Sequence, residues 1–352
     1  LQGSAPPPML PYLTQSIAPI PAKLKVSPED FEVVEVPAYS PSGEGEHVFA
    51  WIEKRGLSTR DAVQGLCEAL GVDLRDAGWA GLKDRQALTR QWISLTGTSA
   101  EAVSGAEVEG VRVLEAMHHP QKLRTGHLKA NRFTIRLRDF DPSRMNDARE
   151  ALTLIERRGL PNYYGEQRFG RDGANARRAL AWVRGEERAP RSAFLRKLQM
   201  SALHSALFNR FVADRVEAST LDQVLPGEIA KKHATGGIFL VEDAEEAQRR
   251  AQAWEISATG PIFGAKMRWP EGAAREREQR LLAEAQLTLS ELAKWKRIGP
   301  GTRRFIRVPV SGLHADLADR TLRLEFTLPA GSYATILIRE ILKGDAPSPE
   351  SG

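Results

Sequence analysis

The spacing of apolar residues predicts strands in the first third of this chain. Segments 31–36 and 47–52 are rich in β-branched and aromatic residues and are separated by a turn-rich stretch, which is typical of two strands joined by a loop. Further short strands are expected at 78–82, 90–95, 111–116 and 132–138. In the last of these, apolar and polar residues alternate, as in an antiparallel strand with one face in water.

A helix is expected from about 59 to 70, because four apolar residues recur there at the spacing of one helical face. They are Val63, Leu66, Cys67 and Leu70. Ser58 or Thr59 can cap the start of this helix, and Gly71 can end it. Cys67 is therefore expected to be a buried thiol rather than a nucleophile. As it is the only cysteine, a disulfide within the chain and a cysteine-based zinc site are excluded.

From residue 143 onward the spacing becomes helical. A helix is expected to start at Ser143 and to end at Arg158, since Gly159 and Pro161 follow. Further helices are expected at 174–184, 192–217, 273–285 and 290–297, with a strand near 237–241. Strands return at 305–310 and 321–326, and a last helix covers about 332–343.

Strand-rich ends therefore flank a helix-rich middle. This order favours an α+β fold, in which a mainly antiparallel sheet with packed helices is interrupted by an inserted α/β domain. The sheet domain would comprise 23–155 and 304–345, and the insertion 156–303. The proline-rich residues 1–22 and the tail 346–352 are expected to be flexible. Two consecutive domains remain the alternative.

Composition narrows the class of protein. The 352 residues are 41% hydrophobic, which allows a substantial core and favours two domains. The chain has no apolar run of about 18 residues, so no membrane span is expected. Its amino terminus lacks a basic start before an apolar block, so a secretory signal is not expected either. We expect a soluble, cytoplasmic protein.

The net charge of +5 is compatible with a nucleic-acid partner, and the basic residues are grouped. One group surrounds Gly299-Pro300-Gly301 and consists of Lys294, Lys296, Arg297, Arg303, Arg304 and Arg307. A second consists of Arg191, Arg196 and Lys197. Each group could simply solvate the surface, or could follow phosphates, with Trp295 and Phe305 stacking on a base or sugar.

Common cofactor and metal signatures are absent from the sequence. It contains no Gly-x-Gly-x-x-Gly after a strand, no Walker-type Gly-Lys-Ser/Thr and no Gly-x-Ser-x-Gly, so no nucleotide cofactor is expected. His118 and His119 have no third ligand at a suggestive spacing, and a polar strand end explains them better than a metal site.

One carboxylate, Asp84, lies among three cations in the stretch 81–91. By composition alone this stretch is an exposed turn with a weak surface ion pair. A carboxylate that is to stay ionised beside an apolar base needs a cation, because burial favours the protonated form. Lys83 and Arg85 are adjacent in sequence but need not point toward Asp84. Lys25, ahead of the first strand, is the other candidate partner.

The pattern Gly-x-Lys-Asp-x-x-Ala-x-Thr-x-Gln at 81–91 resembles the catalytic signature of the TruD family of tRNA pseudouridine synthases. Other elements of that family are matched in order along the chain, at 25–33, 131–133, 161–170, 205–209 and 328–335. Tyr164 stands where the family usually has phenylalanine, and residues 215–290 resemble the family least.

The resemblance implies an enzyme that isomerises a uridine, at position 13 of glutamate tRNA, to pseudouridine without cofactor or metal. It implies that Asp84 is the nucleophile and that Lys25 keeps it ionised. Phe133 would stack on the base where related synthases use a tyrosine, and Asn131 and Phe31 would orient the substrate. The sheet would be of the pseudouridine-synthase type, and the insertion would form the other wall of an RNA cleft.

Simpler roles remain open for several of these residues. Phe31, Phe133 and Phe326 could be ordinary inward-facing aromatics of strands, or one of them could stack on the extruded uracil. Asn131 could cap a turn or read a base edge. Arg168 could bind a phosphate or pair with Glu166.

Two other functions remain alternatives. The first is a non-catalytic RNA-binding or RNA-folding protein that uses the same basic cleft. The second is a carboxylate-dependent hydrolase, which would need a second acid at a fixed distance from Asp84 that the sequence does not identify. The expected partner is tRNA, and the expected oligomeric state is a monomer.

Overall fold

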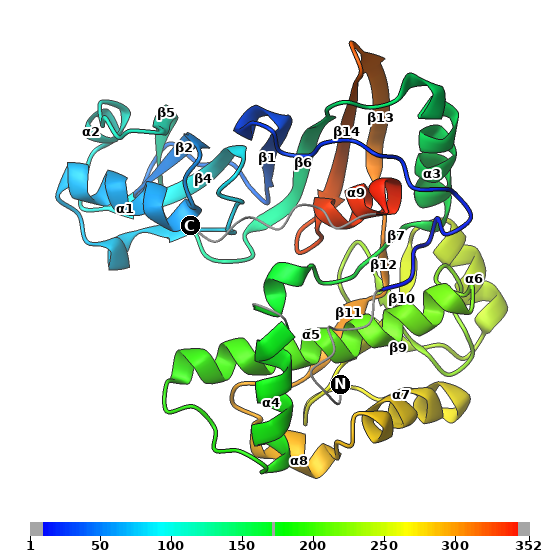
Figure 1. Cartoon of the computed structure of the whole chain (residues 1–352). Helices are drawn as coiled ribbons and strands as arrows, with labels where there is room; N and C mark the ends of the chain where they lie inside the picture. Colours follow the sequence, from blue (N-terminus) through cyan, green and yellow to red (C-terminus); the bar gives the residue numbers. More distant parts are fainter. Residues whose placement is uncertain (1–9, 171–172, 344–352) are drawn as a thin grey trace. The chain divides into compact units, whose positions relative to one another are not determined.

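The computed structural model describes residues 10–170 and 173–343 (Figure 1). These residues form two compact units. The sheet unit consists of Ile17–Thr153, Val310–Ala334 and the chain from Ile341 onward. The helical unit consists of Leu154–Pro309, Thr335–Glu340 and the chain before Ile17. The tail predicted to be flexible, 346–352, lies outside the described residues, as do residues 1–9 of the predicted lead-in.

An eight-stranded sheet forms the sheet unit. Its strands are β1 (Phe31–Pro37), β2 (His47–Arg55), β3 (Gly78–Trp79), β4 (Leu88–Thr96), β5 (Val111–His119), β6 (Leu128–Leu137), β13 (Ser311–Ala318) and β14 (Thr321–Pro329). Their order is β13-β14-β6-β1-β4-β2-β5, with β3 paired to β4. Only the pairing of β1 with β4 is parallel within this sheet. The predicted α+β fold with a mainly antiparallel main sheet is confirmed.

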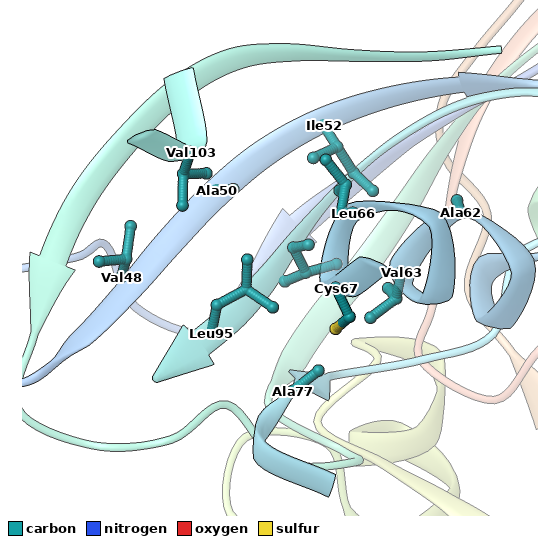
Figure 2. Packing of buried hydrophobic residues seen from close by; sticks show 11 residues of the cluster. Val48, Ala50, Ile52, Ala62, Val63, Leu66, Cys67, Ala77, Leu95 and Val103 are labelled. Atoms are coloured by element: carbon teal, nitrogen blue, oxygen red, sulfur yellow. The ribbon is translucent and has the colours of Figure 1, made fainter. Parts of the chain in front are cut away.

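Helix α1 (Thr59–Leu70) covers one face of β2 and β4 (Figure 2). Its ends are those predicted: the Ser58 hydroxyl accepts from the backbone of Asp61 at 3.1 Å, and Gly71 adopts a left-handed φ of 66°. The packed residues are Val48, Ala50, Ile52, Ala62, Val63, Leu66, Cys67, Ala77, Ile93, Leu95 and Val103. Cys67 is a buried thiol within this cluster, as predicted.

The long helix predicted after residue 143 is also present. A 3-10 turn at Pro142–Arg144 leads into α3 (Met145–Arg158). The last helix is α9 (Ala334–Leu342). Helix α2 (Ala100–Ser104) was not predicted, because five residues are too few to show a helical period. Three other 3-10 turns are Pro28–Asp30, Leu74–Asp76 and Glu166–Arg168.

The helical unit contains a small sheet and several helices. The helices are α4 (Ala174–Arg184), α5 (Ala193–Glu217), α6 (Ala244–Gln252), α7 (Gly272–Glu284) and α8 (Leu289–Lys294). The small sheet has the order β11-β10-β8-β9, from Thr302–Phe305, Ile256–Ile262, Ile229–Lys232 and Ile238–Leu240. A separate pair joins β7 (Leu160–Pro161) to β12 (Arg307–Val308).

Helix α5 packs closely on β10 at a glycine. A Cβ atom on Gly260 would lie 2.8 Å from the ring of Phe211 and 2.9 Å from that of Phe208. Separations this short are not tolerated between packed atoms, so only glycine allows the two aromatic rings of α5 to rest on the strand.

One predicted strand needs correction, and several elements were not predicted. The expected strand at 305–310 is divided, because β11 ends at Phe305, β12 covers Arg307–Val308 and β13 begins at Ser311. Alternation of apolar residues continues through this stretch although the chain changes sheet, so the sequence pattern does not show the break. Strands β8 and β10 and helix α6 were also missed. Nearly every residue of β10 is buried, and it therefore lacks the alternation of a half-exposed strand.

Residues 10–22 are packed rather than forming the flexible lead-in that was expected. Leu13, Ile17 and Ile20 are buried. The hydroxyl of Thr14 donates to the Glu340 backbone carbonyl at 2.7 Å and to its carboxylate at 2.8 Å. Contacts with residues far away in sequence hold this segment in place. The spacing of its apolar residues therefore does not show that it is packed. In residues 10–170 and 173–343, no helix is long and apolar enough to span a membrane.

Candidate active site

Asp84 lies in the loop between β3 and β4, and neighbouring elements of the sheet unit hold the backbone of this loop. The amide of Lys83 donates to the Thr59 hydroxyl at 2.8 Å, and that hydroxyl donates to the Gln91 side chain at 2.9 Å. The ammonium of Lys54 donates to the backbone carbonyl of Asp84 at 2.8 Å. The start of α1, strand β2 and strand β4 therefore fix the position of Asp84 together.

The carboxylate of Asp84 pairs with Lys25, the partner considered in the sequence. Its other oxygen accepts the backbone N–H of Gln86 at 2.9 Å. The side chain of Asp84 is 22% exposed, whereas that of Lys25 is only 6% exposed. The Lys25 ammonium also lies 4.6 Å from the centre of the Phe31 ring. Solvent can therefore reach the Asp84 carboxylate, while the buried ammonium of Lys25 holds it in place.

Lys83 turns away from Asp84 into a second network. Its ammonium pairs with Glu35 at 2.7 Å and donates to the Asn131 side-chain oxygen at 2.9 Å. Burial raises the pKa of Glu35, and the charge of Lys83 opposes that rise. With its oxygen engaged, Asn131 retains two amide protons that have no partner in the described part of the chain. Arg85 is exposed.

Three phenylalanines lie beside this network. Phe133 on β6 is directly opposite Phe326 on β14, and their rings stack with centres 5.3 Å apart. Phe31 meets Phe133 edge to face at 6.2 Å. All three rings are buried, at 4% exposure for Phe31, 6% for Phe133 and 1% for Phe326, and Phe326 supports the ring of Phe133. The structure thus brings together Asp84, Lys25, Phe31, Asn131, Phe133 and Phe326 in one unit.

Four residues of this site were missed in the sequence: Glu35, Lys54, Thr59 and Gln91. Glu35 follows Phe31 and Val33 on the inward face of β1, and Lys54 follows the inward apolar residues of β2. A charged residue at a strand position where the alternation calls for an apolar one is the signal that could have identified Glu35 and Lys54. Burial lowers the pKa of Lys54 to about 8, although the charge of Asp84 opposes this shift.

Arg168 belongs to the helical unit and not to the unit that carries Asp84. Its guanidinium donates to the Ser201 hydroxyl at 2.6 Å and lies 5.5 Å from the Tyr164 ring. Within the described residues, no ion pair joins Arg168 to Glu166. Of the two roles considered for Arg168, pairing with Glu166 is therefore not observed. Arg168 is exposed.

Half of the first basic group does not form a solvated or phosphate-binding surface. Arg303 and Arg307 are buried, at 4% and 3% exposure. Arg303 pairs with Glu278, and Arg307 donates to the carbonyls of Arg158 and Ala251. Arg304 stacks on the Tyr164 ring and donates to Asn162. Of this basic group, only Lys294, Lys296 and Arg297 are exposed. The spacing of basic residues along the chain cannot distinguish buried structural arginines from exposed ones.

The reactive group that the geometry of this site offers is a carboxylate. In the described part of the chain, no group of three or more histidine, cysteine, aspartate or glutamate side chains is arranged to hold a metal ion. An anchored, solvent-accessible carboxylate beside aromatic rings and an unpaired amide can act as a nucleophile toward a planar, hydrogen-bonding substrate.

Comparison with known proteins identifies the family of this chain. A family model described as tRNA pseudouridine synthase D (TruD) matches residues 9–187 and 177–341. The tRNA pseudouridine synthase D of Anaeromyxobacter dehalogenans strain 2CP-1 is 44% identical over 346 residues, which cover 97% of this chain and 98% of that protein. The protein of the same name from Thermus thermophilus is 45% identical over 341 residues, covering 97% of this chain and 94% of that protein.

A solved structure has the same fold. The crystal structure described as that of the "Putative tRNA pseudouridine synthase D (TruD)" from Methanosarcina mazei matches with a TM-score of 0.75 and 21% identity, covering 96% of each chain. The family suggested by the sequence motifs is confirmed by the family model and by these relatives. The chain belongs to the TruD family of tRNA pseudouridine synthases.

Proposed function

We propose that this protein converts uridine 13 of a tRNA to pseudouridine, with Asp84 as the nucleophile. The tRNA that we propose as its substrate is glutamate tRNA. The observation that carries the proposal is the carboxylate of Asp84, which is open to solvent on one side and paired with the buried ammonium of Lys25 on the other. In this pair Lys25 stabilises the negative charge that the reaction needs.

The reaction requires no external reagent. The bond between N1 of uracil and C1′ of the ribose breaks with the help of Asp84, and the detached uracil rotates within the site. A bond then forms between C5 and C1′. The proton on C5 passes to solvent, and N1, which has lost its bond to C1′, takes up a proton from solvent. Product and substrate have the same composition, which is why no second substrate is needed.

Three side chains would position the uracil. The free amide protons of Asn131 can donate to a carbonyl of the base, and Lys83 orients that amide by binding its oxygen. Phe133 would stack on the base, with Phe326 as its support. Phe31 would border the site beside Lys25.

We assign catalysis to the sheet unit and RNA binding to the helical unit. Arg168 and the exposed Lys294, Lys296 and Arg297 provide positive charge on the helical unit for phosphates. The proposal also includes a monomeric enzyme that works in the cytoplasm, where its tRNA substrate is found.

The decisive experiment follows tritium release from tRNA labelled at C5 of uracil, together with the integrity of the RNA. The unsubstituted protein should release tritium from intact tRNA, and Asp84→Ala should release none. Asp139→Ala is the matched control, because Asp139 also pairs with a lysine of the sheet unit but at the exposed surface. Its release should equal that of the unsubstituted protein.

Other outcomes would refute the assignment. Tight tRNA binding without tritium release would favour a non-catalytic RNA-binding protein, and cleaved RNA would favour a hydrolase. Full activity of Asp84→Ala would remove Asp84 from the mechanism.

A further inference from the structure

Two exposed aliphatic side chains flank the Lys25–Asp84 pair. Val26, directly after Lys25, is 64% exposed. Leu82, two residues before Asp84, is 75% exposed, more than any other large hydrophobic side chain in the described part of the chain. Single exposed hydrophobics are common on proteins, so exposure alone means little. Here, however, one such residue adjoins each of the two charged groups of the site.

The backbone on both sides of Leu82 is fixed. Before it, the carbonyl of Gly81 accepts from the Gln91 side chain at 3.1 Å. After it, the amide of Lys83 donates to Thr59 at 2.8 Å, and the Lys83 side chain is only 4% exposed. Leu82 therefore cannot turn inward without breaking these contacts. The loop holds an apolar side chain in water beside Asp84.

Val26 is held outward in a comparable way. Lys25 has a φ of 57°, in the left-handed region that residues other than glycine rarely adopt. With this backbone, the Lys25 side chain is buried against Phe31 and Asp84 while Val26 stays exposed. The conformation that places the cation of the site thus also presents a second aliphatic group.

Exposed aliphatic groups beside the carboxylate that must reach the base suit the extrusion of that base from its stack. A uridine in folded tRNA has to be extruded to reach a carboxylate, and this costs stacking energy. Apolar side chains that enter between bases compensate for that loss in other nucleic-acid complexes. Charged side chains would be poorer here, because the space left between two bases is apolar.

Resting on the proposed function, we propose that Leu82 fills the stacking space that the target uridine vacates and that Val26 contacts the adjoining nucleotide. Both residues act on extrusion of the base rather than on the bond changes at Asp84. The predicted signature is a loss of kcat with a smaller change in KM.

Extrusion can be followed separately from chemistry. A tRNA with 2-aminopurine directly 3′ of the target uridine is titrated with the Asp84→Asn protein, and its fluorescence rises as the stack opens. When Leu82→Ala is combined with Asp84→Asn, the fluorescence plateau of the titration should be lower. Val26→Ala in the same background should lower this plateau less. In the otherwise unsubstituted enzyme, Leu82→Ala should reduce kcat on the order of tenfold, while Leu82→Met retains most of it.

The matched control is Leu114→Ala, which removes another exposed leucine of the sheet unit, on β5. It should change neither fluorescence nor kcat. A tRNA with an abasic site next to the uridine should reduce the penalty of Leu82→Ala, because less stacking has to be lost.

An unchanged plateau and rate in Leu82→Ala would overturn the proposal, as would an equal penalty on the abasic tRNA. Failure of the proposed function gives a different result, the absence of pseudouridine with the unsubstituted protein. The fluorescence titration would still decide on Leu82 in that case.

Discussion

One ion pair of the helical unit and the candidate nucleophile of the sheet unit use charge in opposite ways. In the helical unit, Arg303 and Glu278 have side chains that are each 2% exposed, and two hydrogen bonds of 2.9 and 2.7 Å join them. Arg303 also donates to the backbone and hydroxyl of Thr259. In the sheet unit, Asp84 has one cation, one backbone N–H and an open side.

This difference separates a structural ion pair from a reactive one. A buried charge whose hydrogen-bonding capacity is fully used is stable, but it cannot bind anything else. A carboxylate with remaining capacity and contact with solvent can engage a substrate. Substitutions of the Arg303–Glu278 pair should therefore act on stability, and those around Asp84 on activity.

The largest effect is expected from Arg303→Met. This change leaves Glu278 buried without its partner, so the free energy of unfolding should fall by about 3–5 kcal/mol. Urea unfolding measures the loss. The double variant Arg303→Met/Glu278→Leu should recover much of it, because neither charge then remains buried.

The exposed pair Arg249–Glu245 in α6 serves as the control for this comparison. Arg249→Met should cost less than about 0.5 kcal/mol, since exposed helical pairs contribute little. Equal losses for Arg249→Met and Arg303→Met would contradict the distinction.

Acid should weaken the helical unit through His204. Burial lowers the pKa of this histidine to about 4. The unfolded chain, with a pKa near 6.5, binds the proton more readily between these values. The stability associated with neutral His204 is therefore complete above pH 6.5 and is lost as the pH falls toward 4, by about 3 kcal/mol at most.

Unfolding midpoints in urea between pH 7 and pH 4.5 test this prediction. His204→Gln should decline less steeply over this interval than the unsubstituted protein, whatever its stability at pH 7. Parallel curves for the two proteins would exclude His204 as the cause.

In the sheet unit, Lys25→Met should act on the reaction instead. Loss of the cation beside Asp84 should lower kcat on the order of a hundredfold. The free energy of unfolding should change by about 1 kcal/mol or less, because Asp84 remains accessible to water. Tritium release and urea unfolding together measure both effects.

Lys23→Met is the matched control, since Lys23 pairs with Asp139 at the surface two residues earlier. It should leave both quantities unchanged. If Lys25→Met mainly destabilised the fold and kept its kcat, the pair would be structural like Arg303–Glu278.

The smallest effect is expected from Thr59→Val, which leaves the Lys83 amide and the Gln91 side chain without their shared hydroxyl. Unfolding free energy should fall by about 1 kcal/mol, and kcat should fall a few-fold because the loop that carries Asp84 is less firmly placed. Thr153→Val, which removes an exposed hydroxyl of α3, is the control for both measurements. A loss of stability with unchanged kcat would show that the loop needs no such anchor.

Much of the fold could be predicted because local spacing carries it. Helix α1 has the predicted start and end, since Ser58, Gly71 and the apolar face between them are neighbours in sequence. Strand β10 and helix α6 could not be predicted in the same way, because burial on all sides or a short length removes the periodic signal.

The site was predictable only in part. Motif resemblance led to Asp84, Lys25 and Asn131, and the structure places them in one unit. It did not reveal Glu35 or Lys54. The grouping of basic residues along the chain gave Arg303 and Arg307 the same weight as the exposed lysines of the same stretch. Their burial depends on residues far away in sequence.

The sequence by itself determined the family, the main elements and the identity of the candidate nucleophile, because motifs and periodicity are local properties. Only the tertiary structure decided that Lys25 and not Lys83 or Arg85 faces Asp84, and which arginines are buried. The physical reason is strand register: pairing of β1, β4 and β6 brings Glu35 and Asn131 opposite each other, and the β3–β4 loop then places Lys83 against them. Such proximity depends on contacts between distant segments, which no short stretch of sequence encodes.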